Sequence, residues 1–127
     1  MKLNPDCIRD ILIDIEETTT INASWWYDSH NPSTRLISYD RFEIAYHARY
    51  CYEANLIKDF SIGGDSESVY ALDLTPNGHD FLSNIRENNI WNGVKTVAEK
   101  IGSSSLDALI QISSNVVTEL IKAHFGI

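Results

Sequence analysis

The sequence predicts an α+β domain that is mostly helical. Apolar residues recur at helical spacing in several stretches, and the β-prone runs IKDFSI and SVYALDL flank the glycine-containing GGDSE. At 127 residues and 43% apolar content, the chain is long enough to bury one core. We therefore expect a single domain over residues 1–127, with a small β-hairpin inside residues 1–88 and a C-terminal helical extension over residues 89–127.

The first helix is predicted to begin at Pro5. Asn4 is a favourable N-cap, proline suits the first helical position, and Asp6 places a negative charge at the positive end of the helix dipole. The helix is expected to end at the threonine run 18–20, because β-branched residues are poor helix formers. The apolar residues predicted to form its buried stripe are Cys7, Ile8, Ile11, Leu12 and Ile15.

Residues 18–39 are predicted to form a strand followed by a loop, with a degenerate helix and a mobile loop as open alternatives for 20–39. INASWWY is β-prone, whereas DSHNPST has turn chemistry. Trp25, Trp26 and Tyr27 form the densest aromatic cluster of the chain. Such side chains are enriched at interface hot spots, so we take them as partner-binding residues, with core packing as the alternative.

A second helix is predicted from Asp40 to about Ala54, opened by a D-x-x-E capping box with Glu43. Asn55 is expected to stop it in the left-handed conformation, and the hairpin with the turn GGDSE follows. The side chains predicted on its buried face are Ile44, Ala48, Cys51 and Tyr52. The tyrosines expected to add aromatic surface around the helix are Tyr39, Tyr46, Tyr50 and again Tyr52.

The C-terminal third is predicted to be helical. Thr75 and Pro76 are expected to cap a third helix, and Gly102 and the serines 103–105 to separate a final helical pair that ends near His124.

The last helix carries an apolar face broader than one short neighbouring helix needs. We therefore expect a homodimer with Leu109, Val116 and Leu120 in its interface. Packing of this face across the first helix is the alternative.

Composition limits the function classes. The net charge of −8 opposes contact with phosphate backbones. Cys7 and Cys51 lie in apolar patterns and are read as reduced core thiols, which suits the cytoplasm. The N-terminus lacks the apolar region of a secretion signal, and no apolar run approaches the roughly 18 residues that span a bilayer. We expect a cytoplasmic protein without membrane contact.

Candidate catalytic and metal sites are weak. His47 and Cys51 are four residues apart on one helical face, but a bare pair without further ligands predicts a core cysteine beside a histidine. The serines of SSSLD are better explained as helix caps than as nucleophiles. No phosphate-binding loop or dinucleotide fingerprint occurs. We expect no enzymatic activity, no metal and no cofactor.

Two motifs carry a family resemblance. HARYCYEANLI at 47–57 resembles the end of a winged-helix recognition helix, and LTPNGHDFL at 74–82 resembles the exit of the wing. With NPDCIRDIL and SLDALIQISSNVVTELI, they are similar to uncharacterised proteins of phages, prophages and conjugative elements, a domain of unknown function related to YjcQ-like winged-helix proteins. The resemblance implies a winged helix with a small β-hairpin wing and a C-terminal helical pair, but no activity. The helix that should precede the recognition helix has no counterpart, since residues 28–39 contain Pro32 and no amphipathic period.

The charge pattern decides between two functions. A DNA-reading winged helix needs basic residues on its recognition helix and wing, whereas residues 58–76 hold Lys58 against four acids, Asp65 and Glu67 among them. We expect a non-enzymatic module that binds a host or phage protein, such as a host DNA-binding or defence factor, through Asp65, Glu67 and the aromatic cluster. The alternative is a dimeric DNA-binding transcriptional regulator that reads DNA with Arg41 and Arg49.

Overall fold

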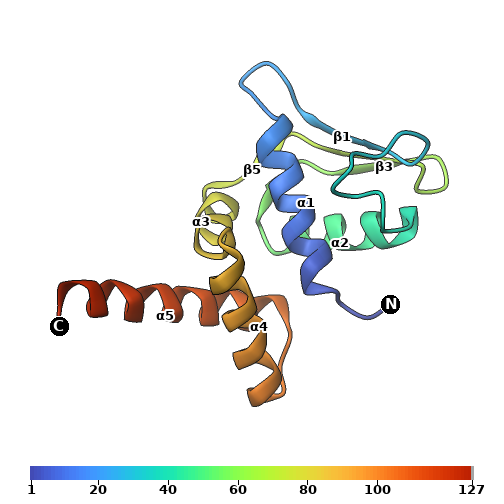
Figure 1. Ribbon diagram of the computed structural model, residues 1–127. Helices are drawn as coiled ribbons and strands as arrows, with labels where there is room; N and C mark the ends of the chain where they lie inside the picture. Colours follow the sequence, from blue (N-terminus) through green and yellow to red (C-terminus); the bar gives the residue numbers. More distant parts are fainter. Residues whose placement is uncertain (127) are drawn as a thin grey trace. The chain divides into compact units, whose positions relative to one another are not determined.

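The computed structural model describes residues 1–126 and has an α+β fold that is mostly helical (Figure 1). This confirms the predicted class. Within these residues there are five helices and two small antiparallel sheets. The elements in order are α1 (Pro5–Thr18), β1 (Trp25–Asp28), α2 (Arg41–Glu53), β2 (Ile57–Lys58), β3 (Ser61–Gly63), β4 (Ser68–Ala71), β5 (Asp73–Leu74), α3 (Pro76–Ile85), α4 (Asn88–Ile101) and α5 (Leu106–Phe125).

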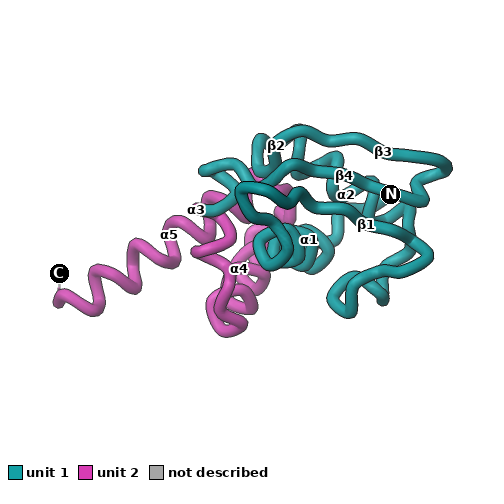
Figure 2. The backbone as a smooth tube through the Cα atoms, turned by 90° about the horizontal axis from the view of Figure 1, so that it is seen from above, with its two compact units in different colours: residues 1–79 teal, residues 80–127 magenta. Residues whose placement is uncertain are grey.

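The chain divides into two compact units, Met1–His79 and Asp80–Ile127 (Figure 2). The boundary lies inside α3, nine residues before the boundary at 88/89 that the sequence predicted. The sequence of α3 does not indicate this boundary, because a continuous helix shows no change in composition where one compact unit ends and the next begins.

Helix α1 forms as predicted. The Asn4 side-chain oxygen accepts hydrogen bonds from the backbone N–H groups of Asp6 at 3.1 Å and Cys7 at 3.4 Å. At the other end, the Thr18 and Thr19 hydroxyls donate to the carbonyls of Asp14 and Ile15, so the threonine run satisfies groups that the helix end leaves open. The residues predicted for the stripe, Cys7, Ile8, Ile11, Leu12 and Ile15, are all fully buried.

The three-stranded sheet has the order β1–β4–β3, so the strand that follows α1 pairs with the later hairpin. The hairpin β3–β4 with its turn at GGDSE confirms that prediction. The run IKDFSI, however, is split into β2 and β3, because Asp59 adopts a positive φ of 51° and turns the chain. Strand β2 then pairs with β5 in a separate two-stranded sheet.

Helix α2 also has the predicted bounds and stop. Asn55 has φ 61°, and the N–H of Leu56 donates to the Cys51 carbonyl at 2.9 Å. The prediction that Tyr52 is buried is wrong: its side chain is 47% exposed and its ring stacks on Phe60. Residues 29–39 form turns and bends, and no helix lies between β1 and α2.

In the second unit α4 and α5 form the predicted helical pair. Gly102 ends α4 in the left-handed conformation with φ 72°, and the Ser105 hydroxyl oxygen caps α5 by accepting from the Ala108 N–H at 3.1 Å. Leu106, Leu109 and Ile112 are buried on the first half of α5. No helix within residues 1–126 has the length and apolar content needed to cross a bilayer.

Candidate functional site

The exposed face of α2 is aromatic. The helix packs on α1 and β4 through buried residues such as Ile44, Ala48 and Cys51. The helical period then turns Phe42, Tyr46 and Tyr50 to the opposite side, four residues apart along one stripe. Phe42 is 44% exposed and Tyr50 38% exposed. These three residues form an aromatic stripe on the outer face of α2.

A shallow groove runs between this face and the hairpin β3–β4. We call it the α2 groove; its volume is about 180 Å³, and Ile62 of β3, 42% exposed, lines it opposite the aromatic stripe. Its lining residues are Met1, Phe42, Ala45, Tyr46, Arg49, Ile62 and Ser66. The groove is therefore apolar over most of its length, with one arginine at its side.

Arg49 lies at the side of the α2 groove and contacts two neighbours on the same helix. Its guanidinium carbon lies 5.4 Å from the centre of the Tyr46 ring. Its Nε is 3.6 Å from Oε1 of Glu53, one helical turn further on, and both side chains are more than half exposed. Exchange of such an exposed pair with a partner's carboxylate costs little, because surface ion pairs contribute ~0–1 kcal/mol.

Arg41 and Asp65, to which the sequence assigned opposite functions, contact each other. The Arg41 Nε donates to the backbone carbonyl of Asp65 at 2.8 Å, and Nη2 lies 3.3 Å from its Oδ2. The guanidinium also covers the ring of Phe42 at 4.5 Å. The arginine proposed for DNA and the acid proposed for a protein partner thus form one contact, which ties the hairpin turn to the start of α2.

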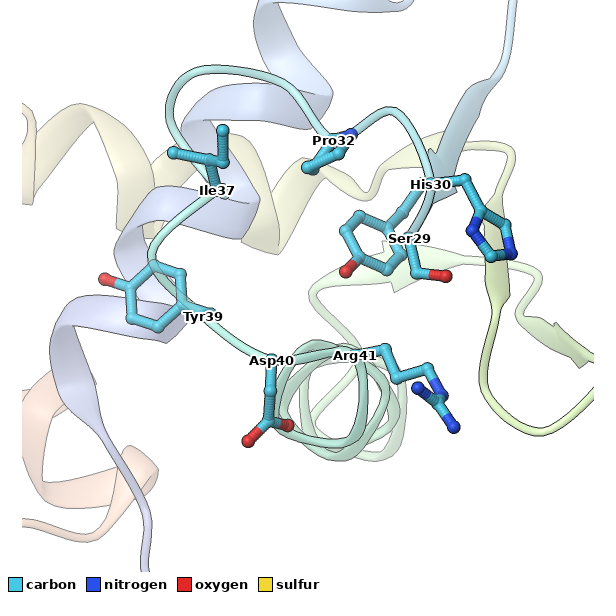
Figure 3. Close-up of a pocket in the computed structure, with 8 residues that line it drawn as sticks. Ser29, His30, Pro32, Ile37, Tyr39, Asp40 and Arg41 are labelled. Atoms are coloured by element: carbon cyan, nitrogen blue, oxygen red, sulfur yellow. The ribbon is translucent and has the colours of Figure 1, made fainter.

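A second concavity, the loop pocket, lies beside this contact (Figure 3). Its volume is about 410 Å³, and it is lined by Tyr27, Ser29, His30, Pro32, Ile37, Tyr39, Asp40 and Arg41. These residues come from the end of β1, the following loop and the start of α2.

The polar groups of the loop pocket are engaged with their neighbours. His30 Nε2 lies 3.5 Å from Oε2 of Glu67, so it and Arg41 each face an acid of the hairpin turn. The Tyr39 hydroxyl donates to Oδ2 of Asp10 at 2.6 Å, and Asp40 accepts from the Glu43 N–H. Because the Arg41 guanidinium and the His30 ring each lie beside a carboxylate, the pocket offers no excess positive charge to an anionic ligand.

The aromatic cluster at 25–27 divides between core and surface, which corrects the prediction that all three residues bind a partner. Trp25 is fully buried and Tyr27 is 4% exposed, because alternate residues of β1 face the core. Burial raises the pKa of the Tyr27 hydroxyl. Only Trp26, 66% exposed, lies on the solvent face, where its ring is 4.7 Å from that of Tyr70 across the sheet.

His47 and Cys51 are buried residues of the protein core. The His47 ring is fully buried, its Nε2 accepts the Asn4 backbone N–H at 2.8 Å, and its Nδ1 lies 2.8 Å from the Glu43 carbonyl, to which it must donate. Both ring nitrogens are thus occupied by backbone groups. Burial raises the pKa of the Cys51 thiol to about 12, which keeps it protonated.

The model of a family of hypothetical proteins, DUF2513, matches residues 2–105. The chain belongs to the DUF2513 family. It is also similar to an uncharacterized protein of Haemophilus influenzae, with 30% identity over 123 residues that cover 95% of this chain and 99% of the relative. No solved structure matches it.

The DUF2513 match confirms the predicted membership in a family of unknown function. It includes every residue of the loop pocket and every residue of the α2 groove except Met1, and it ends at Ser105, the N-cap of α5.

The sequence missed Phe42 and Ile62 as surface residues of this DUF2513 protein. The spacing of Phe42, Tyr46 and Tyr50 on a predicted helix was the available signal for the first. Ile62 carried none, because its exposure depends on where the hairpin lies against α2.

Proposed function

We propose that this DUF2513 protein is a non-enzymatic binding module of phage or mobile-element origin that engages another protein through the α2 groove. The aromatic stripe of α2 opposite Ile62 carries the proposal. Exposed aromatic rings with an arginine at the rim match the composition of protein-binding hot spots. A host DNA-binding or defence factor is the class of partner that the mobile-element resemblance favours.

The order of elements supports a winged-helix relationship. A helix, a strand, a second helix and a hairpin follow one another, and β1 pairs with β4 of the hairpin. In this scheme α2 corresponds to the recognition helix and β3–β4 to the wing. The turns at 29–39 replace the helix that such domains place before the recognition helix. The α2 groove is then the surface that a DNA-reading relative applies to the duplex.

The chemistry of that surface favours protein over DNA. Base readout and phosphate contacts require hydrogen-bond donors and positive charge, but Phe42, Tyr46 and Ile62 are apolar or aromatic. Arg41 is occupied by Asp65, and the hairpin turn adds Glu67. A duplex placed here would meet aromatic rings and carboxylates, with Arg49 as the guanidinium of the groove lining.

One observation favours the alternative, a dimeric DNA-binding regulator. Arg49 is 54% exposed on the outer face of α2 and its partner Glu53 is 65% exposed, so this guanidinium is accessible to a base edge. The two functions make different predictions for substitutions at this residue and on the aromatic stripe.

The test uses Tyr46→Ala, Arg49→Ala and the control Tyr52→Ala, which removes an exposed aromatic ring away from the groove. A protein captured from nuclease-treated bacterial lysate is purified and titrated against each folded variant. We expect Tyr46→Ala to weaken binding by about 10-fold or more, as the loss of a hot-spot ring does, and Tyr52→Ala to leave it unchanged. We expect Asp65→Lys and Glu67→Lys to weaken the same complex.

DNA binding is measured in parallel with genomic duplex fragments at about 150 mM salt. We expect no specific complex below micromolar concentration. A nanomolar complex with a defined operator, abolished by Arg49→Ala and insensitive to Tyr46→Ala, establishes the regulator and overturns the protein-binding proposal. A captured protein that binds the Tyr46→Ala variant as well as it binds the wild type also removes the α2 groove from the proposal.

A further inference from the structure

The second half of α5 exposes an apolar stripe. Val116 and Val117 are half-buried, and Leu120 and Ile121 are 51% and 52% exposed. These four residues recur at spacings of three and four, so they lie on one side of the helix. Polar residues such as Asn115 and Thr118 occupy the other side and are exposed.

This stripe continues the one that packs on α4. In the first half of α5, Leu106 and Leu109 lie on the same side and are buried. Helix α4 has 14 residues and α5 has 20. Figure 1 shows that α5 crosses α4 and that its C-terminal part runs on past the crossing. Leu109 is fully buried, whereas Leu120 on the same side of the helix is 51% exposed.

The charge of the uncovered part differs from that of the chain. Residues 114–126 contain one acid, Glu119, and one base, Lys122, so their net charge is −1 + 1 = 0 with histidine neutral, whereas the whole chain carries −8. Two copies of so acidic a protein repel each other over most of their surface. They approach with the least repulsion through this neutral segment.

We propose that a second copy of this chain covers the stripe, with two α5 helices packed side by side about a two-fold axis. The interface consists of Val116, Val117, Leu120 and Ile121 from each copy. Leu109, which the sequence placed in the dimer interface, is fully buried inside its own unit and lies outside it. An interface of four side chains from each copy is small for a specific interface, so we expect modest association of about −6 to −7 kcal/mol, which is a dissociation constant of tens of micromolar.

The experiment is sedimentation equilibrium of the full chain at about 5 to 200 µM. The test variant is Leu120→Glu with Ile121→Glu, and the matched control is Asn115→Glu with Thr118→Glu, which adds the same charge to the opposite side of the same helix. We expect the wild type and the control to dimerise, and the test variant to dissociate about 100-fold more readily or to remain monomeric. Far-UV circular dichroism establishes that each variant is folded.

Leu120→Ala serves as a second variant that adds no charge, and we expect it to weaken the dimer by about 10-fold. A wild type that stays monomeric up to 200 µM overturns the proposal, and it assigns the stripe to another protein or to another surface of the same chain. A dimer that neither Leu120 variant weakens overturns it as well. This proposal is independent of the α2 groove, because its substitutions lie in the other compact unit.

Discussion

The indole Nε1 of Trp25 donates a hydrogen bond of 2.7 Å to Oδ2 of Asp14, and both side chains are buried, with 0% and 6% exposed. The bond joins β1 to α1 inside the first unit. A buried carboxylate needs a donor, and the tryptophan supplies it from a side chain that also fills the core.

Trp25→Phe is expected to lower the free energy of unfolding by about 2 to 4 kcal/mol, because it removes that donor and leaves the Asp14 carboxylate unsatisfied. Trp26→Phe is the matched control. Its side chain is 66% exposed, so we expect a loss of less than about 1 kcal/mol. Urea unfolding monitored by circular dichroism measures both values, and equal losses contradict the structural assignment.

Gly78→Ala is expected to destabilise the protein by about 3 kcal/mol or more. A Cβ at this position of α3 collides with the Leu56 carbonyl oxygen, and backbone cannot move aside as a flexible side chain does. Gly93→Ala is the control in α4, where a Cβ meets nothing within 4 Å. There we expect a gain of about 0.5 to 1 kcal/mol from the better helix propensity of alanine. Thermal unfolding of both variants checks the opposite signs, and a neutral Gly78→Ala refutes the close approach.

The free energy of unfolding is expected to fall as the pH rises above about 9. Burial raises the pKa of Cys51 from its ordinary 9.0 to about 12, and burial together with the hydrogen bond to Asp10 raises the pKa of Tyr39 above 10.0. Both groups ionise in the unfolded chain before they ionise in the folded one. Their contribution is therefore complete below about pH 9 and is lost as the pH rises toward 12, at a limit of about 1.4 kcal/mol per pH unit for each group.

Urea unfolding between about pH 8 and pH 11 measures this slope. Cys51→Ala and Tyr39→Phe each remove one titrating group, so each variant is expected to show a shallower decline than the wild type, whatever its own starting stability. A wild-type stability that stays level across this range contradicts the burial of both groups.

Local sequence signals determined the helices and turns. The cap at Asn4, the aspartate at 40, the left-handed stop at Asn55 and the glycine at 102 lie where the structure has them, because caps and stops depend on interactions within a few residues. The coarse fold class and the hairpin follow from the same short-range chemistry.

Sequence periodicity predicted the buried stripe of α1, but elsewhere only the tertiary structure decided which residues of an apolar pattern are covered. Tyr52 and Trp26 are exposed while Trp25 and Leu109 are buried, although all four belong to apolar patterns. The contact of Arg41 with Asp65 and the groove between α2 and Ile62 likewise join α2 to residues that follow strand β2 in the chain. Periodicity indicates which residues share one side of a helix or strand. Whether that side is buried depends on the segment that packs against it. That segment is remote in the sequence, so no local pattern determines where it lies.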